Sequence, residues 1–293
     1  MPISNTIAVI CDFDDTLGDD TTNLFLRDIL EMDEKMIDSF WNEEVAKLVK
    51  KGWDPPLAYI DRILALLKQK KLKILNEDLR KLGLKVQLFP GVIDLIPRLE
   101  KFVNSRKEFK EAFVRIEFYV ISGGFEEIIR STQISKSIKD VFGCTFVERN
   151  GQIIPKSIVT FTEKTKFLYA INKGISGLEL RRNPYRVNDV IRRNDRRIAF
   201  SNMIYVGDGP TDIPCFSAVQ SNGGKTIGIL KHVRKGANVM VDKRRAWAIA
   251  RGERTTLGPY HPDYTENSDL YDILKLEIER IGLDISDTAK RLN

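Results

Sequence analysis

Cysteine and histidine are scarce in this sequence. Its 293 residues include three cysteines (Cys11, Cys144 and Cys215) and two histidines (His232 and His261), all isolated from one another. Because no CxxC pair occurs, the sequence favours neither a disulfide framework nor a zinc knuckle. The isolated histidines argue against most zinc sites and most His-based catalysis. A reducing cytoplasm is the expected location.

Long apolar runs are also missing. No stretch approaches the length of a membrane span. The N-terminal residues lack the basic and apolar segments of a signal peptide, so we expect neither secretion nor a membrane partner. A hydrophobic content of 42% and a charged content of 30% are ordinary for a globular protein. The formal net charge of +6 is compatible with an anionic ligand such as a phosphate ester or a nucleic acid.

The N-terminal stretch combines an apolar run with a group of carboxylates. Residues 7–11 are rich in β-branched side chains, which predicts a strand buried on both faces. Asp12, Asp14 and Asp15 follow at once, where open α/β sheets keep their ligand crevices. Asp12 and Asp14 would lie on one side of an extended chain, and a divalent cation would relieve their repulsion. An acidic turn with an aspartate as helix N-cap is the alternative.

The following residues change to a helical pattern. Apolar side chains recur at spacings of three and four over residues 21–32, 34–51 and 55–71, which predicts amphipathic helices. A shorter helix over 76–82 is expected to begin with Asn76 as its N-cap. We therefore expect residues 19–85 to form a separate helical domain, inserted into a core made of residues 1–18 and 86–293. A set of crossover helices is the alternative, although one helix usually suffices for a crossover.

A second buried strand is predicted over residues 116–121. It leads into Ser122, Gly123 and Gly124, and a helix is expected over 126–134. A hydroxyl and several backbone N–H groups at a helix N-terminus can bind an anion, and glycine lets the backbone approach it closely. A plain glycine turn between strand and helix is the alternative.

The next helical pattern brings lysines to a helix start. Extended segments are expected over 143–148 and 153–161, after which Thr162 is expected to cap a helix. A lysine in the first turn meets an unfavourable helix dipole unless an anion compensates it. Lys164 is the preferred candidate for such a role, and Lys166 is its competitor.

Residues 174–199 form an arginine-rich stretch that aromatic residues hardly interrupt. We interpret it as an exposed insertion, with a nucleic-acid footprint as the alternative. Its arginines are Arg181, Arg182, Arg186, Arg192, Arg193, Arg196 and Arg197.

A further buried strand over residues 202–206 ends in the acidic, glycine-containing sequence of residues 207–212. Asp208 and Asp212 lie there, one turn of chain apart, beside Gly207 and Gly209, which permit a tight turn. A strand over 226–230 and a helix near 270–281 close the predicted core.

These four motifs, in this order, resemble those of the haloacid dehalogenase superfamily, in particular its phosphoserine-phosphatase-like branch. They lie at residues 12–16, at Ser122, at Lys164 with Leu168 four residues later, and at residues 207–212. The resemblance implies an α/β fold with a three-layer Rossmann-like core, a central and mostly parallel sheet, and an inserted all-helical cap of the C1 type over residues 19–85.

The resemblance also implies roles for single residues. Asp12 would be the nucleophile, Asp14 the general acid and base, and Lys164 the cation that neutralises the phosphoryl group. Mg²⁺ would be held by Asp12, by Asp14 through its backbone carbonyl, and by Asp208, with Asp212 completing the second shell or holding the lysine. The expected phosphate and substrate contacts are Thr16, Ser122, Gly123, Gly124 and Arg27.

The implied function is hydrolysis of a small-molecule phosphate monoester by a magnesium-dependent phosphatase, through an aspartyl-phosphate intermediate. Asp14 favours phosphate chemistry, since the dehalogenases of the superfamily lack the second aspartate. Thr21 stands where phosphoserine phosphatases carry a glutamate, which argues against phosphoserine itself. A small phosphorylated metabolite is the expected partner. The alternative is a phosphotransferase or a nucleic-acid-binding protein that uses residues 181–197 on the same fold.

Overall fold

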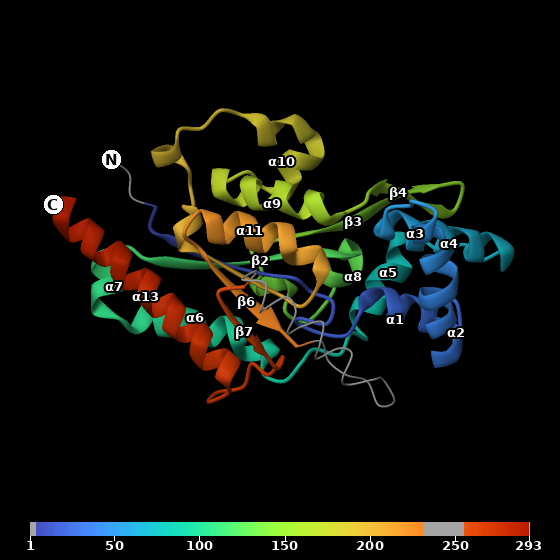
Figure 1. Cartoon of the computed structure of the whole chain (residues 1–293), viewed down its shortest axis with the longest axis horizontal. Helices are drawn as coiled ribbons and strands as arrows, with labels where there is room; N and C mark the ends of the chain where they lie inside the picture. Colours follow the sequence, from blue (N-terminus) through green and yellow to red (C-terminus); the bar gives the residue numbers. More distant parts are fainter. Residues whose placement is uncertain (1–3, 231–254, 293) are drawn as a thin grey trace.

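A seven-stranded sheet forms the centre of the computed structural model, which describes residues 4–230 and 255–292 (Figure 1). The strand order is β4-β3-β2-β1-β5-β6-β7, and every neighbouring pair is parallel except β3 with β4. The strands are β1 (Thr6–Cys11), β2 (Arg115–Phe125), β3 (Asp140–Arg149), β4 (Gln152–Ser157), β5 (Met203–Gly207), β6 (Lys225–Ile229) and β7 (Leu257–Tyr260). The expected central and mostly parallel sheet is confirmed. His232 lies outside the described residues.

Strand β1 lies in the middle of the sheet because both of its faces are apolar. All six of its residues are buried. Since side chains alternate along a strand, Ala8 and Ile10 join the hydrophobic cluster on one face, while Ile7, Val9 and Cys11 join the cluster on the other. The predicted strand, buried on both sides, is confirmed.

Helices cover both faces of the sheet and give the expected three layers (Figure 1). One layer holds α9 (Phe161–Lys173), α10 (Gly177–Arg182) and α11 (Ile213–Ser221). The other holds α6 (Val92–Ser105), α7 (Lys107–Glu111) and α13 (Asp269–Leu292), the last of which is longer than predicted. None of the described helices has the length and apolar character needed to cross a membrane.

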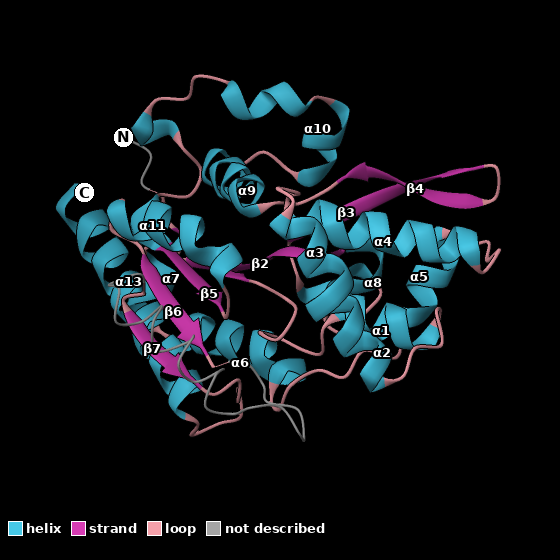
Figure 2. Cartoon of the chain, turned by 45° about the vertical axis from the view of Figure 1, so that its right-hand side comes forward, coloured by secondary structure: helices cyan, strands magenta, loops and turns pink. Residues whose placement is uncertain are grey.

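Residues 21–83 form a group of helices at one end of the molecule (Figure 2). They are α1 (Thr21–Asp28), α2 (Glu34–Ser39), a π-helical turn at Phe40–Val45, α3 (Ala46–Lys50), α4 (Pro55–Gln69) and α5 (Asn76–Gly83). No strand lies among these described residues, as the periodicity predicts. The predicted N-cap is wrong by one position, because Leu75 precedes the helix and the Asn76 N–H instead donates to Glu148 Oε1 at 2.8 Å.

Two further local predictions are wrong. Helix α9 has Thr160, rather than Thr162, as its N-cap residue, because the helix already begins at Phe161. Helix α8 (Glu126–Arg130) has five residues and ends at a turn, well before the predicted end at residue 134. In both places the apolar pattern locates the element, but it does not fix the terminus.

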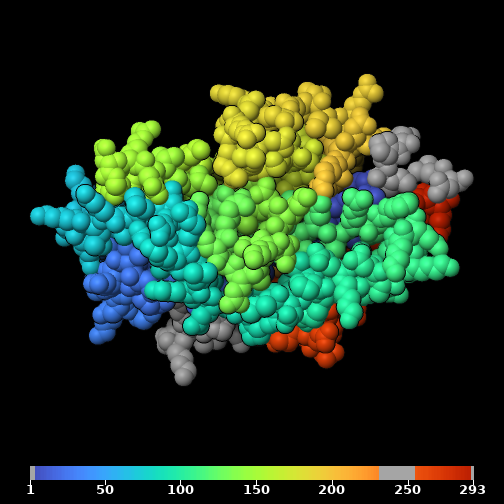
Figure 3. All heavy atoms as spheres, turned by 180° about the vertical axis from the view of Figure 1, so that it is seen from behind, coloured from blue at the N-terminus to red at the C-terminus, as the bar shows by residue number. Residues whose placement is uncertain are grey.

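The arginine-rich stretch lies on the surface, where it appears in yellow in Figure 3. Three of its arginines form ion pairs with carboxylates of this chain: Arg181 with Glu126, Arg186 with Glu179, and Arg197 with Glu117. Arginines that are neutralised within the chain do not favour the nucleic-acid alternative.

The three cysteines are all buried and free of disulfides. Burial raises the pKa of Cys11 and of Cys215 to about 12, and that of Cys144 to about 11. Because the thiolate is the reactive form, we expect none of the three thiols to react with iodoacetamide in the folded protein near neutral pH. Mass spectrometry before and after denaturation in guanidinium checks this. Alkylation of any of them without unfolding would contradict it.

Candidate active site

The strand order reverses at β1, and the acidic motifs meet at that point. Strand β2 lies on one side of β1, and β5 lies on the other, with Cys11 beside Val206. Asp12 continues the ladder, since its N–H donates to the Val206 carbonyl at 2.8 Å. Asp12 and Asp208 therefore follow neighbouring parallel strands at their carboxyl ends, where open α/β sheets form a ligand crevice.

Lys164 reaches this point from helix α9. Its side-chain ammonium donates to Asp12 Oδ2 at 2.7 Å, to Asp212 Oδ1 at 2.8 Å and to Thr211 Oγ1 at 3.3 Å. The residue is 1% exposed, so all three of its protons are satisfied inside the protein. Burial alone would lower the pKa of Lys164, but the carboxylates of Asp12 and Asp212 outweigh it and raise the pKa. The lysine is therefore charged.

Asp212 is held by several donors and has no exposed surface. Besides Lys164, Oδ1 accepts a hydrogen bond from the Tyr205 hydroxyl at 2.8 Å, and Oδ2 accepts one from the Gly209 N–H at 3.2 Å. A Cβ at Gly207 would stand 2.5 Å from Asp212 Oδ2, so only glycine leaves room there. This fixed carboxylate positions Lys164. Sequence reasoning missed Tyr205, which reads as an ordinary core aromatic, and Thr211.

The Asp12 carboxylate is also fixed. Oδ1 accepts the Phe13 N–H at 2.7 Å, and Oδ2 accepts Lys164. Burial raises the pKa of Asp12 to about 6, and Asp212 adds to this shift, while Lys164 opposes it. A carboxylate of this kind is costly to keep ionised without further positive charge nearby.

Asp14 points to a different set of partners. Its Oδ1 accepts the Thr21 N–H at 2.7 Å, and its Oδ2 accepts the Ser122 hydroxyl at 3.2 Å. A Cβ at Gly124 would lie 2.3 Å from Asp14 Oδ2, so this glycine admits the carboxylate. Burial, followed by the carboxylates of Asp20 and Asp12, raises the pKa of Asp14 well above its usual range. Asp14 is thus suited to hold and release a proton.

The backbone after Ile121 differs from the predicted succession of a strand, Ser122-Gly123-Gly124 and a helix. Residues Ser122 to Gly124 belong to β2, which continues to Phe125 with an irregular register. The Gly124 N–H donates to Ser122 Oγ at 2.9 Å, so this amide already has a partner. Helix α8 has five residues and begins with Glu126 and Glu127. Because these two carboxylates carry negative charge at its N-terminus, that helix end does not form the expected anion site. Phosphate binding by Ser122, Gly123 and Gly124 stays a prediction.

Three aspartates form a group that could hold a metal ion. One carboxylate oxygen each from Asp12, Asp208 and Asp212 lies within 4.8 Å of the others. The Asp14 carboxylate is not part of this group and bonds to Thr21 instead, and a metal role for the Asp14 backbone carbonyl stays a prediction. Carboxylates this close together repel one another, and a bound cation would relieve that repulsion.

The remaining predicted residues lie in varied settings. Thr16 has no exposed surface, and its hydroxyl has no hydrogen-bond partner among the described residues. Arg27 forms a surface ion pair with Glu34, and its side chain is 40% exposed. Lys166 pairs with Glu163 rather than with any aspartate of the group, whereas Lys164 contacts Asp12. The roles of Thr16 and Arg27 stay predictions.

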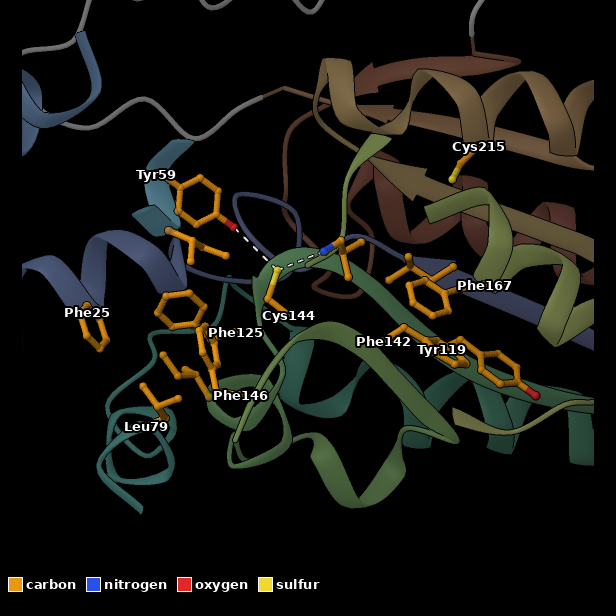
Figure 4. Packing of buried hydrophobic residues seen from close by; sticks show 14 of the residues in the cluster. Phe25, Tyr59, Leu79, Tyr119, Phe125, Phe142, Cys144, Phe146, Phe167 and Cys215 are labelled. Carbon is orange, nitrogen blue, oxygen red and sulfur yellow. Dashed lines mark hydrogen bonds between the residues drawn. The ribbon is translucent and has the colours of Figure 1, made fainter. Parts of the chain in front are cut away.

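The helical group touches the site through Tyr59 of α4. Its hydroxyl donates to the Gly123 carbonyl at 2.5 Å. The same hydroxyl lies 3.9 Å from Cys144 Sγ (Figure 4). A second link connects α1 to the π-helical turn, where Trp41 Nε1 donates to Asn23 Oδ1 at 2.7 Å. The Tyr59 contact holds α4 beside the Ser122–Gly124 segment, and the Trp41 contact joins two parts of the helical group to each other. Nothing in the spacing of the aromatic residues indicates them.

Comparison with known proteins places the fold. No protein-family model matches the chain. An uncharacterized protein of Borreliella burgdorferi is 29% identical over 262 residues, which are 80% of this chain and 83% of that protein. A HAD-family hydrolase from Salmonella enterica serovar Typhi has a TM-score of 0.49 at 17% identity, covering 84% of this chain and 67% of its own. A phosphoserine phosphatase solved as an analogue of its phospho-aspartyl intermediate has a TM-score of 0.52 at 16% identity, covering 93% of this chain and 99% of its own. The likeness to that phosphoserine phosphatase shows that the chain shares its fold.

Proposed function

We propose that this chain is a metal-dependent phosphatase that hydrolyses a small phosphate monoester. One observation carries the proposal: the buried Asp12 carboxylate is bonded to Lys164 at 2.7 Å, within a group of three aspartates at the strand-order reversal. A separate carboxyl, Asp14, has a pKa raised well above its usual range. A nucleophile, a cation and a proton carrier are the parts that phosphoryl transfer requires.

In the first step, a carboxylate oxygen of Asp12 attacks phosphorus, and the bond from phosphorus to the leaving oxygen breaks. Asp14 gives its proton to that oxygen, which departs as an alcohol. The phosphoryl group is then bound to Asp12. The raised pKa of Asp14 supports this role, since a carboxyl must be protonated before it can act as an acid.

In the second step, Asp14 takes a proton from a water molecule as its oxygen attacks phosphorus. The bond between phosphorus and Asp12 breaks, so that inorganic phosphate and the free carboxylate are released and one water is consumed. Lys164 loses an anionic partner when Asp12 is phosphorylated, and its ammonium can then balance charge on the phosphoryl oxygens. Asp212, which accepts a hydrogen bond from the Tyr205 hydroxyl, holds the lysine in place through both steps.

The acidic group fits Mg²⁺, a hard cation that prefers carboxylate and carbonyl oxygens. Asp12 and Asp208 would hold it together with the backbone carbonyl of Asp14, while Asp212, already bonded to three donors, would stay a positioning residue. When bound, the ion supplies positive charge that offsets the nucleophile and the phosphoryl oxygens.

We further propose that residues 19–85 act as a cap over a core of residues 1–18 and 86–293. The first helix of this segment places the Thr21 N–H against Asp14, and Tyr59 bonds to the Gly123 carbonyl. A cap in this position would exclude water from the reacting groups and contact the leaving group. Arg27, on α1, is its predicted substrate contact.

The experiment that tests the function is a phosphate-release screen. The purified full chain is assayed with Mg²⁺ on p-nitrophenyl phosphate and on a panel of nucleotides, sugar phosphates and other phosphorylated metabolites. Release of phosphate from at least one of them is the expected result. If every member of the panel is left intact, the proposal fails. A filter-binding titration with nucleic acid at several salt concentrations tests the alternative, which a steep salt slope would favour.

Removing the metal should stop turnover and lower stability. We expect a chelator to abolish phosphate release, and added Mg²⁺ to restore it and to raise the melting temperature by a few degrees, because the ion relieves repulsion within the acidic group. Differential scanning fluorimetry with and without Mg²⁺ checks the second effect. Asp208→Asn should lose most of this shift, whereas Asp94→Asn, on the surface of α6, should keep it. An equal shift in both variants would rule out binding at this group.

A further inference from the structure

A second cavity, with a volume of about 290 Å³, lies between the β3–β4 hairpin, α9 and α10. Its lining shares no residue with the acidic group or with Lys164. Figure 3 shows the hairpin, in lime, beside the yellow segment that contains α10. The volume lies close to the lower end of the range for small-molecule pockets, about 300–1,000 Å³. The proposed phosphatase chemistry makes no use of this cavity.

Positive charge predominates in its lining. Lys156, Lys166 and Arg181 face two glutamates, so three positive and two negative side chains leave a net charge of +1. Lys166 pairs with Glu163, and Arg181 Nη1 donates to Glu126 Oε1 at 2.9 Å. Lys156 is the exception: it has no carboxylate partner among residues 4–230 and 255–292. An anion that enters the cavity would pair with Lys156 and balance the net positive charge of the lining.

The cavity also offers hydroxyl groups and an aromatic wall. Thr145 and Ser157 line it, and neither hydroxyl has a hydrogen-bond partner within the described part of the chain. Phe142 and Phe167 line it as well, stacked with their ring centroids 4.6 Å apart and their planes 22° apart (Figure 4). Hydrogen-bond donors beside a flat apolar surface suit a ligand that has one polar end and one apolar end.

We propose that this cavity binds a small organic anion, whose carboxylate or phosphate group meets Lys156, Thr145 and Ser157 and whose apolar or aromatic part lies against Phe142 and Phe167. Carboxylate and phosphate share the chemistry that these donors recognise, namely anionic oxygens.

The cavity and the candidate active site share helix α9. Glu163, Lys166 and Phe167 line the cavity, and Lys164, on the same helix, bonds to Asp12 and Asp212. An anion that draws Lys166 away from Glu163 would change the contacts of this helical turn. We infer that occupancy of the cavity alters turnover, an inference that rests on the proposed phosphatase function, whereas binding itself does not.

Binding is tested on the full chain by isothermal titration with benzoate and with phenylphosphonate, whose carbon–phosphorus bond resists hydrolysis, and with benzyl alcohol as the neutral control. At least one anion should bind, and benzyl alcohol should not. Lys156→Glu should weaken the binding about tenfold or more, and Ser157→Trp, which fills the cavity, should do the same. Lys136→Glu, an exposed lysine outside the cavity, is the matched control and should bind as the wild type does.

The outcomes separate the ligand classes and the two sites. Binding of benzoate alone assigns a carboxylate, and binding of phenylphosphonate alone assigns a phosphate. Affinity kept in Asp208→Asn but lost in Lys156→Glu places the anion in this cavity. Equal affinity in Lys156→Glu and Lys136→Glu, or no binding of either anion, overturns the proposal.

The effect on turnover is measured separately, with p-nitrophenyl phosphate at saturating concentration of whichever anion binds. We expect a change of about twofold or more in wild type and none in Lys156→Glu. The same rate with and without the anion in wild type overturns the inferred effect on turnover while leaving the binding site in place. If the phosphatase screen finds no activity, the effect on turnover cannot be measured, but the isothermal titration still tests binding of the anion.

Discussion

Asp12→Asn is expected to reduce phosphate release by about 10³-fold or more, because an amide oxygen cannot act as the nucleophile that takes up the phosphoryl group. The substitution keeps the shape of the side chain, and Asp212 still holds Lys164. The fold should therefore persist. The loss is measured as kcat on the best substrate of the screen, with circular dichroism and thermal unfolding as measures of folding.

The control for this variant is Asp19→Asn, which removes a negative charge seven residues further along the chain in a partly exposed position. It should retain activity within a few-fold of wild type. Trapping a phosphorylated wild-type chain by rapid acid quench, and its absence in Asp12→Asn, adds a direct test of the covalent step. Substantial turnover by Asp12→Asn would refute the nucleophile assignment.

Lys164→Met is expected to lower the free energy of unfolding by about 3–5 kcal/mol when measured without metal. The side chain is 2% exposed and is bonded to two carboxylates, which are 8% and 0% exposed. Methionine fills a similar volume but leaves both carboxylates without their cation. Urea unfolding in the presence of a chelator measures the loss, which Mg²⁺ should reduce because the ion restores positive charge to the aspartates.

Lys166→Met is the matched control for that measurement. Its side chain is 27% exposed, pairs with the partly exposed Glu163, and lies over the Phe167 ring with Nζ 4.9 Å from the ring centroid, so the expected change is about 1 kcal/mol or less. Activity should fall sharply in Lys164→Met and little in Lys166→Met. Similar losses of stability in the two variants would show that the buried ion pairs at Lys164 do not contribute as inferred.

The positions of the central strands were predictable from the sequence, because a run of apolar residues that is buried on both faces fits only one place in the sheet. Residues 7–11 and 203–206 are apolar at consecutive positions, and only a central parallel strand buries both of their faces. The meeting of residues 12 and 208 followed from that placement, since parallel strands end at one edge. The helical segment was predictable for a similar reason, because its apolar period is helical throughout.

Contacts made by single polar atoms were not predictable. Tyr205 occupies an apolar strand position, and its hydroxyl finds Asp212 only because β5 and the following turn fold back on each other. Asp14 has the spacing of a partner for Asp12, yet the Thr21 N–H and Ser122 draw its carboxylate elsewhere. The glycines at residues 123 and 124 suggested that the strand ends before them, whereas β2 continues to Phe125, which pairs with Cys144 of β3.

The distance along the chain between Asp12 and Lys164 has a consequence for how the protein is made. These residues are 152 positions apart, and Asp212 is 48 further on. At typical rates of synthesis on the ribosome, Lys164 is added to the chain roughly 8–30 s after Asp12. Until then the nascent chain lacks the lysine that encloses Asp12, so the centre of the sheet is completed late, after β5 and the turn to residue 212 have emerged.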